Sequence, residues 1–470
     1  MREYQENSTE FIKRNMNCAV WMDLGLGKTV TTLTAISDLM RSFDASRVLL
    51  IAPLRVARKV WTDEVKEWSH VSDLRVSVMC GSVAERLAAM RAEADIYCIN
   101  RENVAWLCQQ FVIRDNGRLK QIAKWPWDTV ILDESDSFKS QSSERWKWMK
   151  RVRRLFPRMI QLTGTPTPNG YADLWSQIYL LDGGKRLGST ESAFKERFMD
   201  PPGFGQMRWT MKPHSEKHIK DLLADIVISL RAEDYLDLPP ILHNHIRVEL
   251  PKEALKHIEK LERMFITEIV PEKKVTAANG GVLYGKLLQM AGGAVYRQVN
   301  ETIRETIPLH DEKIKALLEL IELTPGPVMV AYSFQHEQER IEKALVPWCA
   351  KHQKTVRRLK TVVDENDWNA GKVDVLLLHP ASGGHGLNLQ FSGSENIIWF
   401  GPTPNRGHYD QLNARLAGGH RRVGKNIVIH HILAEDTIDI WDTLPLLENK
   451  GEAQERLLRL LADKVQAVSS

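Results

Sequence analysis

The sequence has few cysteines and no hydrophobic run long enough to cross a bilayer. Its five cysteines are odd in number and lack the spacing of a metal or redox site, so a disulfide framework is not indicated. We expect reduced thiols that lie mostly in the core. The N-terminus also lacks the basic region and apolar core of a secretory signal. We therefore expect a cytoplasmic protein without a membrane partner.

The chain also lacks a large excess of charge of one sign. Its 64 Lys and Arg residues nearly balance its 60 Asp and Glu residues, and the net charge of +4 does not by itself indicate a polyanion partner. Basic residues nevertheless gather at 145–158 and at 351–360. We leave two interpretations of each run open, a solvated helix face and a polyanion contact.

What the sequence does contain is a glycine-rich segment, MDLGLGKT at 22–29, between an apolar run and residues at helical spacing. At such a strand-to-helix turn, backbone N–H groups and the positive end of the helix favour a phosphate. Lys28 is expected to reach the β- and γ-phosphates, and Thr29 to place its hydroxyl on Mg²⁺. The other nucleotide-binding candidates in the segment are Gly25, Leu26 and Gly27.

An acidic pair follows another apolar run. Residues 129–132 predict a buried strand that ends directly in Asp133 and Glu134. Acidic residues at the carboxyl end of a parallel strand face the ligand crevice. We expect Asp133 to hold Mg²⁺ through water, and Glu134 to orient and deprotonate the attacking water. Gln5, on a helix that precedes the glycine-rich segment, is expected to read an adenine edge with its amide.

Predicted strands alternate with predicted helices along both halves of the chain. In the first half, apolar runs at 48–52 and 96–100 accompany the strands described above, which favours a parallel sheet. In the second half, runs at 328–332, 373–378 and 397–400 predict another such sheet. We therefore expect an α/β fold with two parallel-sheet lobes in tandem.

The order of the motifs resembles the first lobe of a superfamily-two helicase core. These motifs are Gln5, GLGKT at 25–29, APLR at 52–55, DESD at 133–136 and TGTP at 163–166. Residues 51–54 with Trp61 to Trp68, and Leu230-Arg231 shortly before LPP at 238–240, resemble the Swi/Snf branch of double-stranded DNA translocases. The compact spacing before Gln5 is similar to that of bacteriophage members.

Two segments of the second half resemble the fifth and sixth motifs of the same family, at 380–389 and 410–425. Glycines in the fifth motif permit close backbone approach, and Gly386 is expected at the nucleotide. The sixth motif implies arginines that stabilise negative charge developing on the γ-phosphate.

The sixth motif keeps only part of the family's spacing. Gln411 and Arg415 stand at the expected separation and are the catalytic candidates of this segment. An apparent insertion at 417–419 then leaves the second arginine open between Arg421 and Arg422, with the register favouring Arg422.

The resemblance implies two RecA-like lobes that hydrolyse ATP with Mg²⁺ at an interlobe cleft while moving on double-stranded DNA. The DNA is expected to be held through its phosphates, without sequence specificity, by loops that follow the strands. The expected contacts are Arg55, Arg58, Arg101, Asn103, Thr163, Ser382, Gly383 and Gly384.

The resemblance also suggests a division of the chain. We expect lobe 1 at 1–236 with a helical insertion at about 185–230, lobe 2 at 237–446 with a helical protrusion at about 250–305, and a C-terminal helix at 447–470. Two alternatives to the translocase stay open, a strand-separating DNA or RNA helicase and a slow ATP-dependent DNA-binding switch. A protein partner for loading also stays open, and a phage-encoded member is expected to work in the cytoplasm of a bacterial host.

Overall fold

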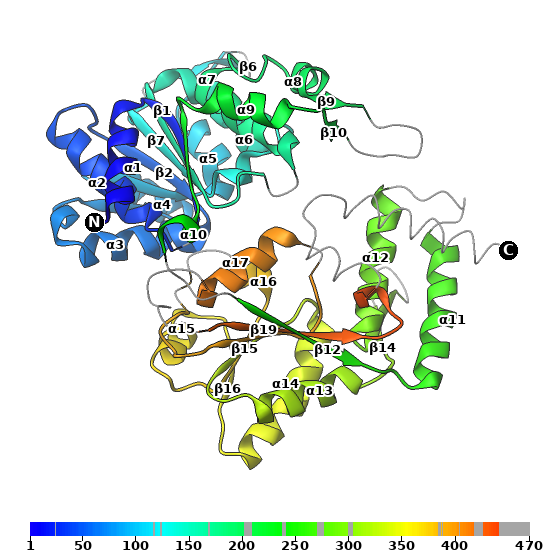
Figure 1. Cartoon of the computed structure of the whole chain (residues 1–470). Coiled ribbons are helices and arrows are strands. Elements are labelled where there is room, and N and C mark those ends of the chain that lie inside the picture. Colours follow the sequence, from blue (N-terminus) through cyan, green and yellow to red (C-terminus); the bar gives the residue numbers. More distant parts are fainter. Residues whose placement is uncertain are drawn as a thin grey trace. The chain divides into compact units, whose positions relative to one another are not determined.

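The computed structural model describes residues 1–23, 25–115, 118–122, 125–167, 170–201, 209–236, 241–269, 277–298, 304–383, 387, 389–403, 405–417 and 426–440 (Figure 1). The chain divides into two compact units, Met1–Asp237 and Leu238–Ser470. The C-terminal helix expected at 447–470 lies outside the described residues. Within the described part of the chain, no helix is both long enough and apolar enough to span a bilayer.

The first unit is built on a seven-stranded parallel sheet with the order β11-β1-β8-β7-β2-β4-β3. Its strands are β1 Asn17–Met22, β2 Val48–Ala52, β3 Val76–Met79, β4 Ile96–Asn100, β7 Thr129–Asp133, β8 Arg158–Thr163 and β11 Val227–Leu230. Every residue of the central strands β2, β4, β7 and β8 is buried. Such strands read as nearly continuous apolar runs because helices cover both faces of the sheet.

Helices of the first unit form two packed groups. One group comprises α1 Glu3–Arg14, α2 Lys28–Arg41 and α3 Trp61–Glu67, and the other comprises α5 Val104–Gln109, α6 Glu144–Val152, α7 Leu174–Asp182 and α8 Glu191–Phe198. The second group and the sheet share a large core cluster that includes Trp127, Trp146 and Trp175. The remaining helices are α4 Val83–Arg91, α9 Ser215–Leu223 and α10 Ala232–Tyr235. Two antiparallel hairpins, β5 Val112–Asp115 with β6 Arg118–Ile122 and β9 Met199–Asp200 with β10 Thr210–Met211, complete the unit.

Both edge strands of this sheet were missed from the sequence. Strand β11 lies at 227–230, within the range expected for a helical insertion, and pairs in parallel with β1. Its four residues, VISL, are mostly apolar, but so short a run does not distinguish a strand from part of a helix. The range expected for the insertion therefore ends in a strand of the main sheet.

The second unit is built on a six-stranded parallel sheet with the order β12-β19-β18-β15-β17-β16. Its strands are β12 Leu242–Val248, β15 Val328–Ala331, β16 Val356–Arg358, β17 Val375–Leu378, β18 Asn396–Trp399 and β19 Val428–Ala434. Helices α13 Glu312–Leu323 and α14 Gln335–Lys351 share a core cluster with this sheet. A second cluster joins the sheet to α15 Val362–Asn369 and α17 Arg406–Ala417. The expected fold class, two parallel-sheet α/β lobes in tandem, is confirmed.

A helical hairpin extends the second unit (Figure 1). Helix α11 Lys252–Ile269 packs against α12 Ala277–Ala291, and the antiparallel strands β13 Ala294–Gln298 and β14 Arg304–Pro308 follow. The two helices, β13 and the end of β19 share their own core cluster.

A buried ion pair joins α13 to the segment after β19. Lys313 and Asp439 are paired, and each side chain is only 1% exposed. Lys313 also donates to the backbone oxygen of Phe400, and Asp439 accepts from the backbone N–H of Ala434 at 3.0 Å. Because both charges are removed from water, each depends on the other for compensation.

We expect Asp439→Ala to lower the free energy of unfolding by roughly 3–5 kcal/mol, because it leaves the Lys313 ammonium buried without its partner. The measurement is the urea midpoint, followed by circular dichroism. Lys315→Ala is the matched control, because it breaks an exposed pair with Glu312 on the same helix and is expected to change the midpoint little. Equal midpoints for the two variants would contradict the prediction.

Candidate functional site

The carboxyl ends of the parallel strands bring the predicted motifs of the first unit to one edge of the sheet. Strand β1 leads into the phosphate loop, residues 22–29, and its neighbour β8 leads into the turn at 163–166. Strand β7, next to β8, ends in Asp133 and Glu134. The strand order therefore unites segments that are about 140 residues apart in the sequence.

The backbone of the phosphate loop has the conformation that its glycines permit. Gly25 and Gly27 both have φ of 85°, in the left-handed region that other residues enter only at a cost. Gly27 directly precedes α2, whose fourteen residues begin at Lys28. The Nζ of Lys28 donates to the backbone oxygen of Met22 at 2.5 Å, so this side chain folds back across the loop. Thr29 lies half-buried in the first turn of α2. This arrangement fits the phosphates of a nucleotide.

Gln5 of α1 is bonded directly to the phosphate loop. Its Nε2 donates to the backbone oxygen of Leu26 at 3.0 Å, and its Oε1 accepts from the N–H of Arg2 at 2.9 Å. Each end of the amide keeps one further hydrogen-bonding position. The adenine contact expected of Gln5 stays a prediction, and the structure adds a second role in holding the loop.

The acidic pair at the end of β7 is held in a defined geometry. Asp133 is 8% exposed, and its Oδ2 accepts from the indole N–H of Trp61 at 2.9 Å. Its Oδ1 accepts from the backbone N–H of Glu134 at 3.0 Å. Glu134 itself has φ of 52°, a left-handed conformation that is costly for a residue with a side chain and is concentrated at functional sites.

Burial sets the electrostatics of this pair. It raises the pKa of Asp133 to about 6, and the neighbouring Glu134 carboxylate also raises this pKa, whereas the Trp61 N–H and the charge of Lys28 oppose the rise. A cation beside Asp133 would relieve this penalty. Asp133 and Thr29 are the residues that would hold Mg²⁺. No group of three or more His, Cys, Asp or Glu residues with metal-binding geometry occurs among the described residues. A small number of protein ligands is enough for Mg²⁺, because the ion usually keeps waters and substrate phosphates as its other ligands.

A polar network that sequence reasoning missed connects the acidic pair to the turn at 163–166. The hydroxyl of Ser135 donates to Gln177 Oε1 at 3.0 Å. The Nε2 of Gln177 donates to the backbone oxygens of Pro166 at 2.8 Å and Asp173 at 3.0 Å. Gln177 is a polar residue within the mostly apolar helix α7, and this was the signal in the sequence that could have identified it. Thr163, expected at DNA, is fully buried, and its hydroxyl accepts from the N–H of Thr165 at 3.0 Å.

The other predicted DNA contacts of the first unit follow two adjacent strands. Arg55 is half-buried and Arg58 is exposed, both just after β2. Arg101 and Asn103 follow β4, which pairs with β2. The Nε of Arg101 donates to Glu102 at 3.1 Å, and Asn103 donates to the side chain of Asn100 at 2.6 Å. The structure therefore places these four residues at the same sheet edge as the phosphate loop.

The predicted residues of the second unit are only partly described. Gln411 and Arg415 lie one turn apart on α17, and Arg415 Nη1 donates to the backbone oxygen of Leu387 at 3.1 Å. Gln411 is 6% exposed, and its Oε1 has no hydrogen-bond partner within the described part of the chain. Ser382 and Gly383 belong to the short helix α16 Pro380–Gly383. Gly384, Gly386, Arg421 and Arg422 lie outside the described residues.

The basic run at 145–158 is partly used to hold the fold. Arg153 donates to the backbone oxygens of Leu180 and Phe156, and Arg158 donates to that of Ile12. The structure therefore favours an internal role for these two guanidinium groups over a polyanion contact.

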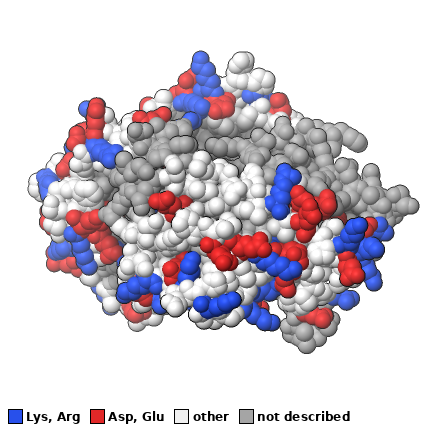
Figure 2. Space-filling model, turned by 60° about the horizontal axis from the view of Figure 1, so that its bottom comes forward, with Lys and Arg blue, Asp and Glu red and all other residues white. Residues whose placement is uncertain are grey.

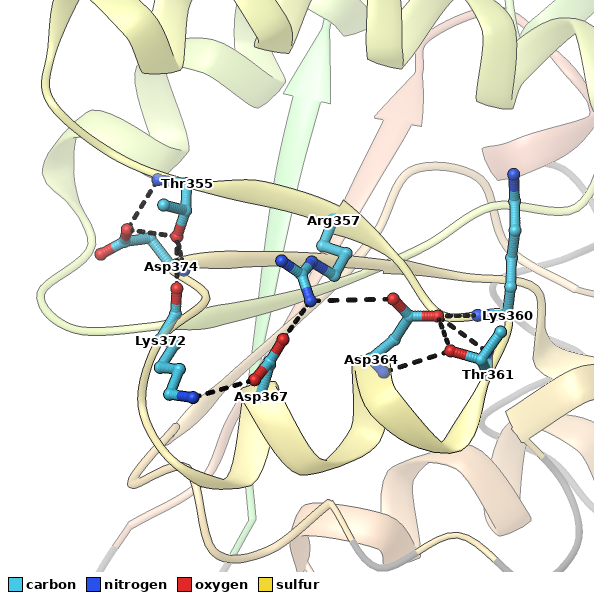
Figure 3. Close-up of polar contacts among 8 residues, drawn as sticks. All are labelled: Thr355, Arg357, Lys360, Thr361, Asp364, Asp367, Lys372 and Asp374. Atoms are coloured by element: carbon cyan, nitrogen blue, oxygen red, sulfur yellow. Dashed lines mark hydrogen bonds and ion pairs between the residues drawn. The ribbon is translucent and has the colours of Figure 1, made fainter.

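The basic run at 351–360 is partly neutralised by neighbouring carboxylates (Figure 3). Arg357 pairs with Asp367 and lies 3.9 Å from Asp364, and Lys372 pairs with Asp367 at 3.2 Å. On the face drawn in Figure 2, basic and acidic side chains are interspersed. Within the run these ion pairs involve Arg357, and for this residue they favour a solvated surface over a polyanion contact.

We expect Gly27→Ala to weaken nucleotide binding by about tenfold or more, or about 1.4 kcal/mol. The added Cβ would lie 2.4 Å from Gln5 Nε2 and would displace the side chain that holds the loop. Titration with a fluorescent ATP analogue measures the affinity. Gly371→Ala is the control, because that glycine also has positive φ but has open space around its Cβ position. Unchanged affinity in Gly27→Ala would contradict the prediction.

Comparisons with known proteins identify the family of the chain. A family model described as SNF2-related domain matches residues 4–291. A "Putative protein p41" of Acyrthosiphon pisum secondary endosymbiont phage 1 is 36% identical over 437 residues, which cover 89% of this chain and 90% of that protein. The "DNA annealing helicase and endonuclease ZRANB3" of Homo sapiens is 22% identical over 97% of this chain but only 40% of its own length.

The chain thus spans nearly all of the phage relative but less than half of the other relatives named as helicases or remodelling proteins. Among solved structures, the "Sulfolobus solfataricus SWI2/SNF2 ATPase core in complex with dsDNA" is 18% identical with a TM-score of 0.43. That match covers 100% of this chain and 94% of the other.

Proposed function

Because the chain belongs to the SNF2-related domain family, we propose that it is an ATPase that moves along double-stranded DNA. The observation that supports this most directly is the gathering of the phosphate loop and the acidic pair Asp133-Glu134 at one sheet edge. Arg55 and Arg58, the proposed DNA contacts after β2, share that edge. ATP hydrolysis and phosphate-backbone contact are therefore assigned to neighbouring parts of one lobe.

Each residue of the site has a distinct task in this proposal. Lys28 and the loop N–H groups bind the β- and γ-phosphates. Thr29 through its hydroxyl and Asp133 through a water would hold Mg²⁺, which when bound would neutralise charge on the phosphates. Glu134 orients the attacking water and accepts its proton.

Further groups of the site are assigned to the second unit, because its residues 410–425 resemble the family's sixth motif. Gln411 and Arg415 are proposed to act at the γ-phosphate, together with one of Arg421 and Arg422. The buried Gln411 Oε1, which has no partner among the described residues, supports a function that a ligand or a further part of the chain completes.

DNA binding is proposed to depend on phosphates. Arg55, Arg58, Arg101 and Asn103 donate to phosphate oxygens, so affinity carries little sequence information. The choice of DNA is supported by the human relative, which is named as a DNA annealing helicase, and the choice of a duplex by the Swi/Snf-like motifs. The cytoplasm of a bacterial host as the place of action is a further proposal, supported by the phage relative. A separate loading protein is also proposed, from the resemblance alone.

We expect duplex DNA to stimulate ATP hydrolysis more than single-stranded DNA or RNA does. Glu134→Gln is expected to lower the stimulated turnover by roughly 10²–10⁴-fold, because the general base is lost. Lys28→Ala is expected to abolish turnover by weakening nucleotide binding. Steady-state phosphate release without nucleic acid and with each nucleic acid measures these effects.

The outcomes separate the alternatives. Stimulation only by single strands or RNA would favour a strand-separating helicase, and a lack of stimulation by any nucleic acid would favour a switch. Translocation without strand separation is expected to displace the third strand of a DNA triplex but not to unwind a forked duplex.

We expect Arg58→Ala to reduce the salt dependence of duplex binding. Each phosphate contact adds about one to the slope of log affinity against log salt concentration, so the variant's slope is expected to be about one unit smaller. Fluorescence anisotropy with a labelled duplex, between about 50 and 200 mM salt, measures the slope. Lys220→Ala, which removes an exposed cation paired with Glu216 on α9, is expected to retain the slope of the unaltered protein. Identical slopes for all three proteins would contradict the proposed contact.

A further inference from the structure

Trp61 connects two functional parts of the first unit. Its side chain is fully buried, and its indole N–H donates to Asp133 Oδ2 at 2.9 Å. The other carboxylate oxygen accepts from the N–H of Glu134. Two donors on different oxygens fix the rotation of the carboxylate. Each oxygen still has a lone pair for a water on a metal ion.

The position of Trp61 in the chain ties this carboxylate to the proposed DNA contacts. Trp61 is the first residue of α3 and directly follows a π-helical turn, Val56–Val60. Arg58 lies on that turn, and Arg55 immediately precedes it. Single π-helical turns are rare and are often found at functional sites. Arg58 and Trp61 are three residues apart, so a displacement of the turn moves the indole as well.

The acceptor distinguishes Trp61 from other buried tryptophans. The indole N–H groups of Trp146, Trp175 and Trp368 each donate at 2.9 Å to a backbone oxygen, which a structural role explains fully. Trp61 donates instead to a buried carboxylate 72 residues away in the sequence. A hydrogen bond to a charged acceptor is roughly twice as strong as one between neutral groups.

We propose that Trp61 is a positioning residue that couples the DNA-contacting turn, residues 55–60, to the carboxylate that holds Mg²⁺. The proposal rests on the proposed function, because it takes Arg55 and Arg58 as phosphate contacts. Trp61 touches neither ATP nor DNA in this account. It holds Asp133 in the orientation that receives the metal ion. When the turn contacts DNA and is displaced, the hydrogen bond of the indole transmits that displacement to Asp133.

The main test is Trp61→Phe in the full chain, which keeps an aromatic ring but removes the N–H donor. ATP hydrolysis is measured as a function of Mg²⁺ concentration, with and without saturating duplex. We expect the Mg²⁺ concentration at half-maximal rate to rise by about 10–100-fold, the usual effect of losing a residue that orients a metal ligand. We also expect stimulation by duplex to fall by at least about tenfold, with nucleotide-free duplex affinity unchanged.

Trp146→Phe is the matched control. It removes an indole N–H that is also buried in the first unit and also donates at 2.9 Å, but to the backbone oxygen of Ser176. We expect it to keep the Mg²⁺ dependence and the stimulation of the unaltered protein. The same change in both variants, or no change in Trp61→Phe, would overturn the proposal.

A measurement on the unaltered sequence keeps the proposal testable if Trp61→Phe folds poorly. In protein with ¹⁵N-labelled indoles, the indole signal that moves in Asp133→Asn identifies Trp61. We expect duplex DNA without nucleotide to shift this signal, and an unmoved signal with bound duplex would overturn the coupling. If the unaltered protein neither binds duplex nor is stimulated by it, the proposed function fails, whereas the Mg²⁺ dependence of Trp61→Phe still tests the positioning role.

Discussion

The burial of a carboxylate at the end of a central strand is the constraint on which the first unit depends. Asp133 lies at the carboxyl end of β7, between β2 and β8, where water is largely excluded. An ionised group there requires compensating donors and charges. They come from separate elements, the indole of Trp61 on α3, the N–H of Glu134 and the ammonium of Lys28 on α2. The packing of α2 and α3 on the sheet therefore brings Lys28 and Trp61 to Asp133 and so assembles the site.

Left-handed backbone conformations occur at the same place. Gly25 and Gly27 in the phosphate loop and Glu134 after β7 all have positive φ. A glycine enters that region at little cost, whereas Glu134 does not, so the surrounding sheet must hold it there. Glu134 is also the proposed general base. We infer that its function requires this orientation, although the backbone conformation lowers stability.

Charge runs in the sequence do not by themselves identify a binding surface. The guanidinium groups of Arg153 and Arg158 bond to backbone oxygens, and Arg357 bonds to carboxylates. A count of cations along the chain cannot show which of them are already satisfied by groups distant in the sequence. The exposed Arg58 is the stronger candidate because it lies just after the end of a central strand.

The sequence by itself determined strands that are buried on both faces, because such strands are nearly continuous apolar runs, and so β2, β4 and β7 were predicted. It also determined the residues whose chemistry depends on local spacing, the phosphate loop and the pair Asp133-Glu134. Only the tertiary structure decided the edge strand β11, because an apolar run of four residues does not distinguish a strand from part of a helix. It alone also revealed the hydrogen bonds of Trp61 and Gln177, because their partners lie 72 and 42 residues away and become neighbours only through the order of strands in the sheet.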